Sequence, residues 1–123
     1  MIKNILLVGL GGGIGSIARY LCQRWLAANY ISAFPWGTLA VNIIGCFAIG
    51  IFWGMIFKSF DTNESWKLFL MTGLCGGFTT FSAFTLEGIG LLKEQKLALF
   101  FSYVAASMLV GLLATYAGMK ITR

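Results

Sequence analysis

Hydroxyl and amide side chains set within long apolar stretches are the residues of this sequence that could do chemistry. The chain has 123 residues, contains no histidine and carries only four acidic side chains. A nucleophile, a base and a group that orients the base are therefore not available together. The cysteines Cys22, Cys46 and Cys75 occur without a C-x-x-C pair, so packing in apolar surroundings is their expected use. We predict that the chain is not an enzyme.

The densest group of unusual residues lies in the third apolar stretch. Three glycines within Gly73–Gly77 are followed by the β-branched pair Thr79 and Thr80. Both residue types disfavour a continuous helix. We predict a helix that is broken across Gly73–Thr80, and a merely kinked helix packed through its glycines is the alternative. A break would free carbonyl oxygens that can coordinate a cation and amide groups that favour an anion.

Ring edges and hydroxyl groups suited to an anion follow this segment. Phe81 and Phe84 are three positions apart and share a helical face. The edge of a phenyl ring carries partial positive charge, so it can hold an anion without a full charge, although packing is the ordinary use of phenylalanine. In the last stretch, Tyr103, Ser107 and Thr115 wind along one face. These hydroxyls predict a polar track or, alternatively, simple hydrogen bonds between helices.

Four further polar side chains lie within or close to the apolar stretches, where the cost of desolvation makes each a functional candidate. Asn42 lies one turn after Thr38 and offers two amide hydrogens and an acceptor. It could line a pathway or form a hydrogen bond between helices. Arg19 could extend to the membrane interface or line the entrance for an anion. Glu87, the only acid inside a stretch, could lie on the pathway or reach the turn beside Lys93.

Long apolar stretches must position these residues. Hydrophobic residues make up 59% of the chain and charged residues 11%, whereas soluble domains carry roughly a quarter of charged residues. A membrane-spanning helix needs about 20 apolar residues, and four stretches qualify, at about 5–21, 38–57, 68–92 and 97–119. We predict an all-α integral membrane protein that forms a single four-span domain over residues 1–123 in contact with lipid. The basic residues do not cluster, so a nucleic-acid partner is not expected.

The lysines and arginines are nearly balanced between the two sides of the membrane. Four crossings put both termini on one side, which holds Lys3, Lys58, Lys67, Lys120 and Arg123. The other side holds Arg24, Lys93 and Lys96, together with Arg19 if it extends that way. Orientation follows the difference in basic residues between sides, and here it is small. The balance favours insertion in both orientations and an antiparallel dimer, and a slight preference for cytoplasmic termini is the alternative.

Three segments together resemble the Fluc (CrcB) family of fluoride channels. They are Gly11–Tyr20 (GGGIGSIARY), Pro35–Asn42 (PWGTLAVN) and Gly73–Phe84 (GLCGGFTTFSAF), of which the third is the most specific. The resemblance covers essentially the whole chain, in order and with matching loop lengths. It implies an antiparallel, dual-topology homodimer with two fluoride pores along the subunit interface.

The same resemblance implies roles for individual residues. Asn42 would donate to fluoride, and the ring edges of Phe81 and Phe84 would face the ions. The polar track would consist of Tyr103, Ser107 and Thr115. A structural sodium ion at the dimer centre would be held by backbone carbonyls of Gly76 and Thr79 from both subunits. The implied role is passive export of fluoride across the inner membrane of a bacterial cell.

Two departures from the family pattern and one rival class complete the expectations. Gly111 lies where relatives often have serine, and Ala83 replaces a frequent threonine between the two phenylalanines. The main rival is a proton-coupled exporter of the small multidrug resistance kind, which needs an acid embedded in the membrane, typically in the first span. The first span has none. A non-conducting scaffold subunit would leave the break and the hydroxyl track without a use.

Overall fold

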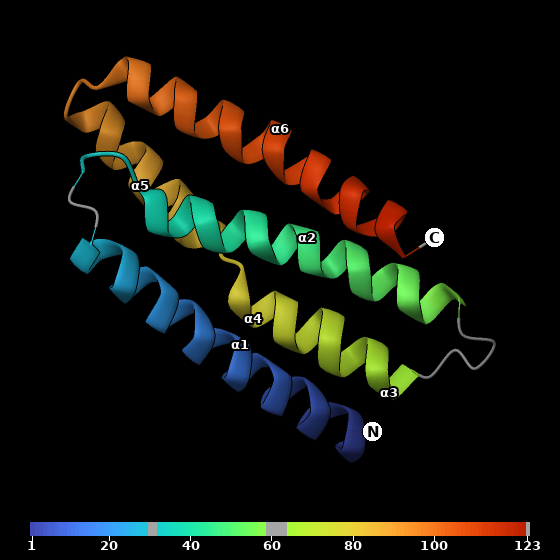
Figure 1. Ribbon diagram of the computed structural model, residues 1–123. Helices are drawn as coiled ribbons and strands as arrows, with labels where there is room; N and C mark the ends of the chain where they lie inside the picture. The colour runs from blue at the N-terminus through green and yellow to red at the C-terminus, as the bar shows by residue number, and fades with distance from the viewer. Residues whose placement is uncertain (30–31, 59–63, 123) are drawn as a thin grey trace.

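The computed structural model describes residues 1–29, 32–58 and 64–122, and most of these residues are helical (Figure 1). Helix α1 comprises Ile2–Asn29, α2 comprises Trp36–Lys58 and α6 comprises Leu97–Ile121. The third segment is composite. It contains α3 (Glu64–Lys67), the π-helix η1 (Leu68–Cys75), α4 (Gly76–Phe78) and α5 (Phe81–Lys93).

Within the described residues, four helical segments are long and apolar enough to cross a membrane. They are Ile2–Asn29, Trp36–Lys58, Glu64–Lys93 and Leu97–Ile121. The prediction of an all-helical chain with four spans is therefore confirmed. Both termini lie at the same end of the bundle (Figure 1). Arg123, which the sequence assigned to that end, lies outside the described residues.

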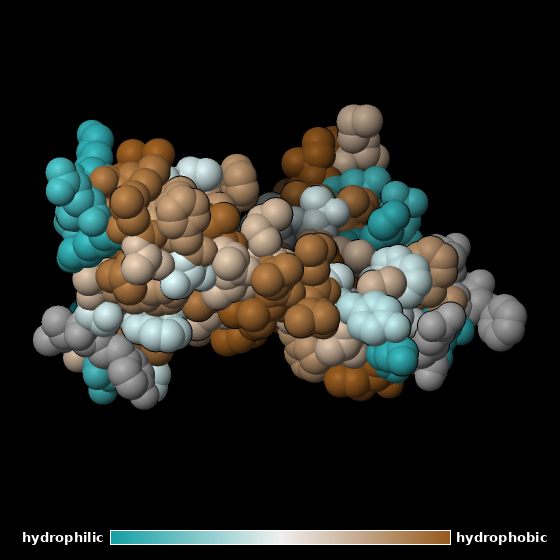
Figure 2. All heavy atoms as spheres, turned by 90° about the horizontal axis from the view of Figure 1, so that it is seen from above, coloured by the Kyte–Doolittle hydropathy of each residue, from teal (hydrophilic) through white to brown (hydrophobic). Residues whose placement is uncertain are grey.

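The surface of the single chain agrees with immersion in lipid. Hydrophilic residues gather toward the two ends of the molecule, and apolar residues occupy the middle (Figure 2). Few apolar side chains are fully enclosed, and the small buried core contains Leu39, Leu91 and Tyr103. Many large apolar side chains on all long helices are exposed instead. In water such a surface would be strongly unfavourable, so lipid or a protein partner must cover it.

Glycines let the helices approach closely. Gly118 of α6 lies against the backbone of α2, where an added Cβ would overlap the carbonyl oxygen of Phe47. Gly15 of α1 lies against η1 in the same way, and a Cβ there would overlap the Leu74 carbonyl oxygen. Small residues at such positions are typical of helix pairs in membranes. These two contacts therefore hold helices together within one chain.

The third segment changes neighbours halfway along its length. Its first half, η1 and α4, packs on α1, whereas its second half, α5, packs beside α6. In Figure 1 the segment accordingly passes behind α2. The two halves meet at Thr79 (φ −88°, ψ 157°) and Thr80 (φ −147°, ψ 120°), which are extended. Two extended residues thus let one segment serve two sides of the bundle.

The extended residues occupy only the end of the range in which the sequence predicted a break. Gly73 lies in η1, and Gly76 and Gly77 begin α4, so the glycines themselves are helical. An eight-residue π-helix is unusual, because π-helices occur mostly as single turns inside α-helices. The Thr80 hydroxyl accepts the amide of Ala83 at 3.2 Å and caps the start of α5. The two threonines therefore interrupt the helix, and Thr80 is the N-cap of α5.

Candidate functional site

Asn42 binds the interrupted backbone through both ends of its amide. Its Oδ1 accepts the Thr80 amide at 2.7 Å, and its Nδ2 donates to the Thr80 carbonyl at 3.0 Å. The side chain thus replaces the partners that a continuous helix would have given this residue. Nδ2 carries two hydrogens, and the Thr80 carbonyl uses one. The structure therefore shows the interhelical hydrogen bond as one role of Asn42 and leaves a second N–H for another acceptor.

Arg19 satisfies a second backbone group near the interruption. Its Nε donates to the Gly77 carbonyl at 3.1 Å, and the Ser16 hydroxyl approaches the same oxygen at 3.5 Å. In a continuous α-helix this carbonyl would accept the amide of Phe81. The guanidinium thus connects α1 to α4. Ser16 was not selected from the sequence, because nothing in its spacing marks it as facing Gly77.

The carbonyls of Gly76 and Thr79 border the same interruption. The Thr80 amide, which would donate to the Gly76 carbonyl in a continuous helix, donates to Asn42 instead. The Thr79 amide and hydroxyl both donate to the Cys75 carbonyl, at 3.0 and 2.9 Å. The Gly76 oxygen is thus deprived of its helical donor, and backbone carbonyl oxygens are ligands suited to Na⁺. The donor chemistry fits the predicted ion.

Most of the predicted pathway residues meet around one cavity of about 380 Å³, which we call the central cavity. Asn42 comes from α2, Thr80 from the interruption, Phe81 and Phe84 from α5, and Ser107 from α6. The fold therefore brings together side chains that lie far apart in the sequence.

The two phenylalanines occupy different environments. Phe81 is 75% exposed in the single chain, whereas Phe84 is half-buried. Their ring centroids are 5.8 Å apart with a 40° angle between planes. Phe84 also packs on Tyr103, at 5.1 Å between centroids. Phe81 is thus free to face lipid or a second copy.

The hydroxyls predicted to form a track fall into two groups. Tyr103 is fully buried, and Ser107 borders the central cavity. Within the described residues, their two hydroxyl oxygens are the buried side-chain atoms without a hydrogen-bond partner. Thr115 is not among the residues that line this cavity, and its hydroxyl donates to the Cys46 carbonyl at 3.0 Å. Unpaired buried hydroxyls are costly and mark a place for a ligand or water.

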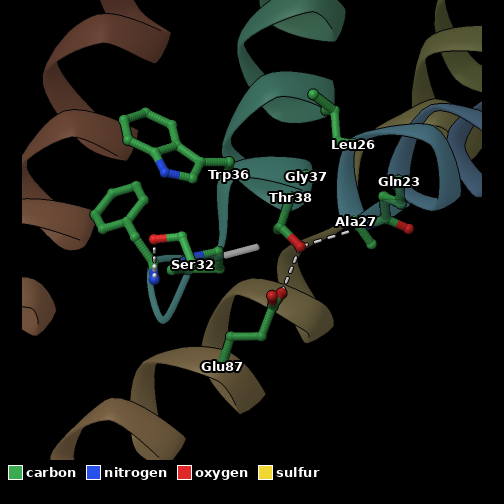
Figure 3. Close-up of a pocket in the computed structure, with 10 residues that line it drawn as sticks. Gln23, Leu26, Ala27, Ser32, Trp36, Gly37, Thr38 and Glu87 are labelled. Atoms are coloured by element: carbon green, nitrogen blue, oxygen red, sulfur yellow. Dashed lines mark hydrogen bonds between the residues drawn. The ribbon is translucent and has the colours of Figure 1, made fainter. Parts of the chain in front are cut away.

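A chain of polar side chains leads to Glu87 at a second cavity of about 380 Å³ (Figure 3). The Gln23 amide donates to the Thr38 hydroxyl at 3.1 Å, and Thr38 in turn donates to the Glu87 carboxylate. Thr38 is 2% exposed, so burial makes this arrangement specific. The Glu87 carboxylate thus bonds to Thr38 of α2. In the turn after α5, the ion pair joins Glu94 to Lys96, at 3.1 Å between the Lys96 Nζ and the Glu94 carboxylate. Gln23 was not selected from the sequence.

The chain is similar to proteins of one family over its whole length. The family described as "CrcB-like protein, Camphor Resistance (CrcB)" matches residues 6–119. A protein of Rhizobium johnstonii named "Fluoride-specific ion channel FluC" is 46% identical over 123 residues, which cover 100% of this chain and 98% of the relative. Proteins with the same name from Rhizobium etli and Flavobacterium psychrophilum are 45% and 42% identical. The alignments cover 96% and 98% of this chain, and 94% and 98% of the relatives.

Proposed function

The chain belongs to the CrcB family, and we propose that it is a fluoride-selective ion channel that exports fluoride passively from the cytoplasm. Relatives of 42–46% identity over nearly their full lengths carry the name of a fluoride channel. A family of ion channels is not a family of enzymes, in agreement with the sequence prediction. The observation that carries the proposal is the central cavity, where neutral donors and phenyl rings surround an interrupted helix.

The donors of the central cavity suit a small, strongly hydrated anion. Conduction requires groups that replace water but do not hold the ion too tightly to release it. The second Asn42 N–H and the unpaired Ser107 hydroxyl are neutral donors at this cavity. The edges of Phe81 and Phe84 add partial positive charge without a full cation. Tyr103 packs on Phe84, and its buried hydroxyl, which has no hydrogen-bond partner among the described residues, is a further neutral donor.

Thr115, Arg19, Thr38 and Glu87 have supporting positions in this proposal. The Thr115 hydroxyl connects α6 to α2 through the Cys46 carbonyl and is available to the ion only if that bond opens. Arg19 donates to the Gly77 carbonyl just before the interruption, and its charge adds positive potential there. Glu87 and Thr38 lie at the second cavity, which we propose as the aqueous approach to the pathway.

The working unit is an antiparallel homodimer with two pores along its interface. Extended backbone at membrane depth is tolerated only where protein or a water-filled cavity covers it. In the single chain Phe81, directly after the interruption, is 75% exposed, so a second copy is a suitable cover. The nearly balanced basic residues allow that copy to insert in the opposite orientation. The bacterial relatives favour the bacterial inner membrane as the location.

A structural sodium ion at the dimer centre fits the same arrangement. Carbonyls of Gly76 and Thr79 from two chains would supply hard oxygen ligands, and the ion would supply positive charge that holds two interrupted helices together. Side-chain alternatives are few, because the described residues contain no cluster of three or more His, Cys, Asp or Glu side chains that could hold a metal.

The test is fluoride release from liposomes that contain the purified protein. A fluoride gradient should dissipate rapidly, whereas an equal chloride gradient should persist. Protein-free liposomes and liposomes with heat-denatured protein give the baseline. Equal release of both ions, or no fluoride release from vesicles with confirmed insertion, would refute the proposal. Proton-driven uptake of a quaternary ammonium cation would instead favour the small multidrug resistance class.

A further inference from the structure

Four sulphur-containing side chains from three helices belong to residues that line the central cavity. Cys46 comes from α2, Met71 and Cys75 from η1, and Met108 from α6. Both cysteines are free thiols; Cys75 is 3% exposed and Cys46 is half-buried. The proposed fluoride pathway uses none of these four side chains. Their convergence on one cavity is therefore a separate feature of the molecule.

The two cysteines come from segments that pack directly on each other. A Cβ at Gly45, the residue before Cys46, would overlap the Thr79 side chain, and the Thr79 hydroxyl donates to the Cys75 carbonyl at 2.9 Å. Met71 and Cys75 are four positions apart on η1, so they lie on neighbouring turns of the helix. On the α6 side, a Cβ at Gly111 would be 3.6 Å from the Cys46 sulphur. The glycine thus leaves space beside this thiol.

The ligand set selects a soft ion of low charge. Thiolate and thioether sulphur prefer Cu(I)-like ions, whereas carboxylate and water suit Mg²⁺ and Ca²⁺. None of the described residues that line the cavity is acidic, and the chain has no histidine. A monovalent cation with one thiolate forms a neutral unit, which avoids the cost of a net charge in apolar surroundings. A divalent ion would need both thiols to ionise to reach neutrality.

We propose that the central cavity binds one soft monovalent cation of the Cu(I) or Ag(I) class through the sulphurs of Cys46 and Cys75. The thioethers of Met71 and Met108 complete the ligand set, because methionine side chains are flexible enough to move onto a bound ion. Binding forms metal–sulphur bonds and releases one thiol proton to solvent, with no change of oxidation state. Because Asn42 and Phe84 border the same cavity, the bound ion blocks fluoride conduction. Only this last consequence rests on the proposed function.

Calorimetric titration of the purified full-length protein with silver nitrate in chloride-free buffer tests the site. Cys22→Ser serves as the background, because Cys22 lies on α1 and does not border the cavity. We expect one Ag⁺ per chain. Cys46→Ser or Cys75→Ser should each weaken binding at least about 100-fold, since even a partner beyond the direct ligands contributes 10–100-fold to metal affinity. Met108→Leu should weaken it less. Unchanged affinity in the Cys46→Ser/Cys75→Ser protein would overturn the proposal.

Two further measurements make the result decisive. X-ray absorption at the silver edge should show at least three sulphur neighbours in the Cys22→Ser protein. Two independent ions per chain, each lost with one cysteine, would refute a shared site. Fluoride efflux should be blocked by Ag⁺ in the Cys22→Ser protein and not in the protein that also lacks both cavity thiols. Stoichiometric Ag⁺ binding without fluoride efflux in any variant would refute the channel and leave the metal site standing.

Discussion

Replacement of Asn42 by leucine tests the link between the interrupted helix and conduction. Leucine has a similar volume but cannot bond either backbone group of Thr80, which Asn42 now contacts at 2.7 and 3.0 Å. Each buried backbone group left without a partner costs about 1–3 kcal/mol. With two such groups, the substitution should destabilise the interrupted conformation by about 2–6 kcal/mol compared with the wild-type protein. The variant also removes the second N–H, which the proposed pathway uses.

We expect Asn42→Leu to reduce fluoride efflux by at least about 10-fold, since 1.4 kcal/mol corresponds to a factor of ten. An ion-selective electrode records the efflux, and size-exclusion chromatography of the same preparation reports assembly. Asn29→Leu is the matched control, because the Asn29 amide also donates to a carbonyl, that of Trp25 at 2.8 Å, but at an exposed position of α1 that does not line the central cavity. Wild-type efflux in Asn42→Leu would show that this residue neither supports the interruption nor serves the ion.

Three further substitutions test packing and the surroundings of the cavity. Gly111→Ser should assemble normally and conduct at or above the wild-type rate, because an added Cβ meets its nearest side-chain atom at an ordinary 3.6 Å; lost assembly on size-exclusion chromatography would contradict this. Gly118→Val should lower the thermal midpoint in detergent strongly, since its Cβ would overlap the Phe47 carbonyl and overpacking costs about 1–3 kcal/mol; an unchanged midpoint would mean that α2 and α6 do not meet there. Arg19→Gln should lower stability by about 1–3 kcal/mol, because the Gly77 carbonyl loses a charged donor at 3.1 Å. A denaturation curve measures this change, and a midpoint equal to that of the wild type would assign Arg19 to the membrane interface alone.

Local pattern predicted the helices, because each apolar stretch is defined by neighbouring residues. Four apolar stretches of sufficient length are visible in the sequence, and the structure has four helical segments there. The partners of the interruption were not predictable in the same way. Asn42 and Thr80 are 38 positions apart, and Arg19 and Gly77 are 58 apart. Periodicity within one helix says which residues share a face, and it does not say which face of another helix they meet.

The glycines of the third segment show where propensity misleads. Their low helix propensity suggested that they would belong to the break, yet Gly73 and Gly77 are helical. A Cβ at Gly77 would overlap the Gly12 carbonyl of α1, and one at Gly73 would be 3.0 Å from the Gly11 Cα. The close approach of the two backbones explains why glycine is present at these positions, although the chain remains helical there. Tertiary contact therefore overrode the local preference, and the interruption falls on the threonines.

The interruption is stabilised within one chain, which separates its formation from assembly. Asn42 bonds both backbone groups of Thr80, Arg19 bonds the Gly77 carbonyl, and the Thr79 amide remains on Cys75. Such bonds remove most of the cost that bare extended backbone would carry in lipid. In the single chain, Phe81, which lines the central cavity, remains exposed. In the proposed dimer a second copy therefore encloses the pathway and does not create the interruption, so a monomer isolated in detergent should keep the bonds between Asn42 and Thr80.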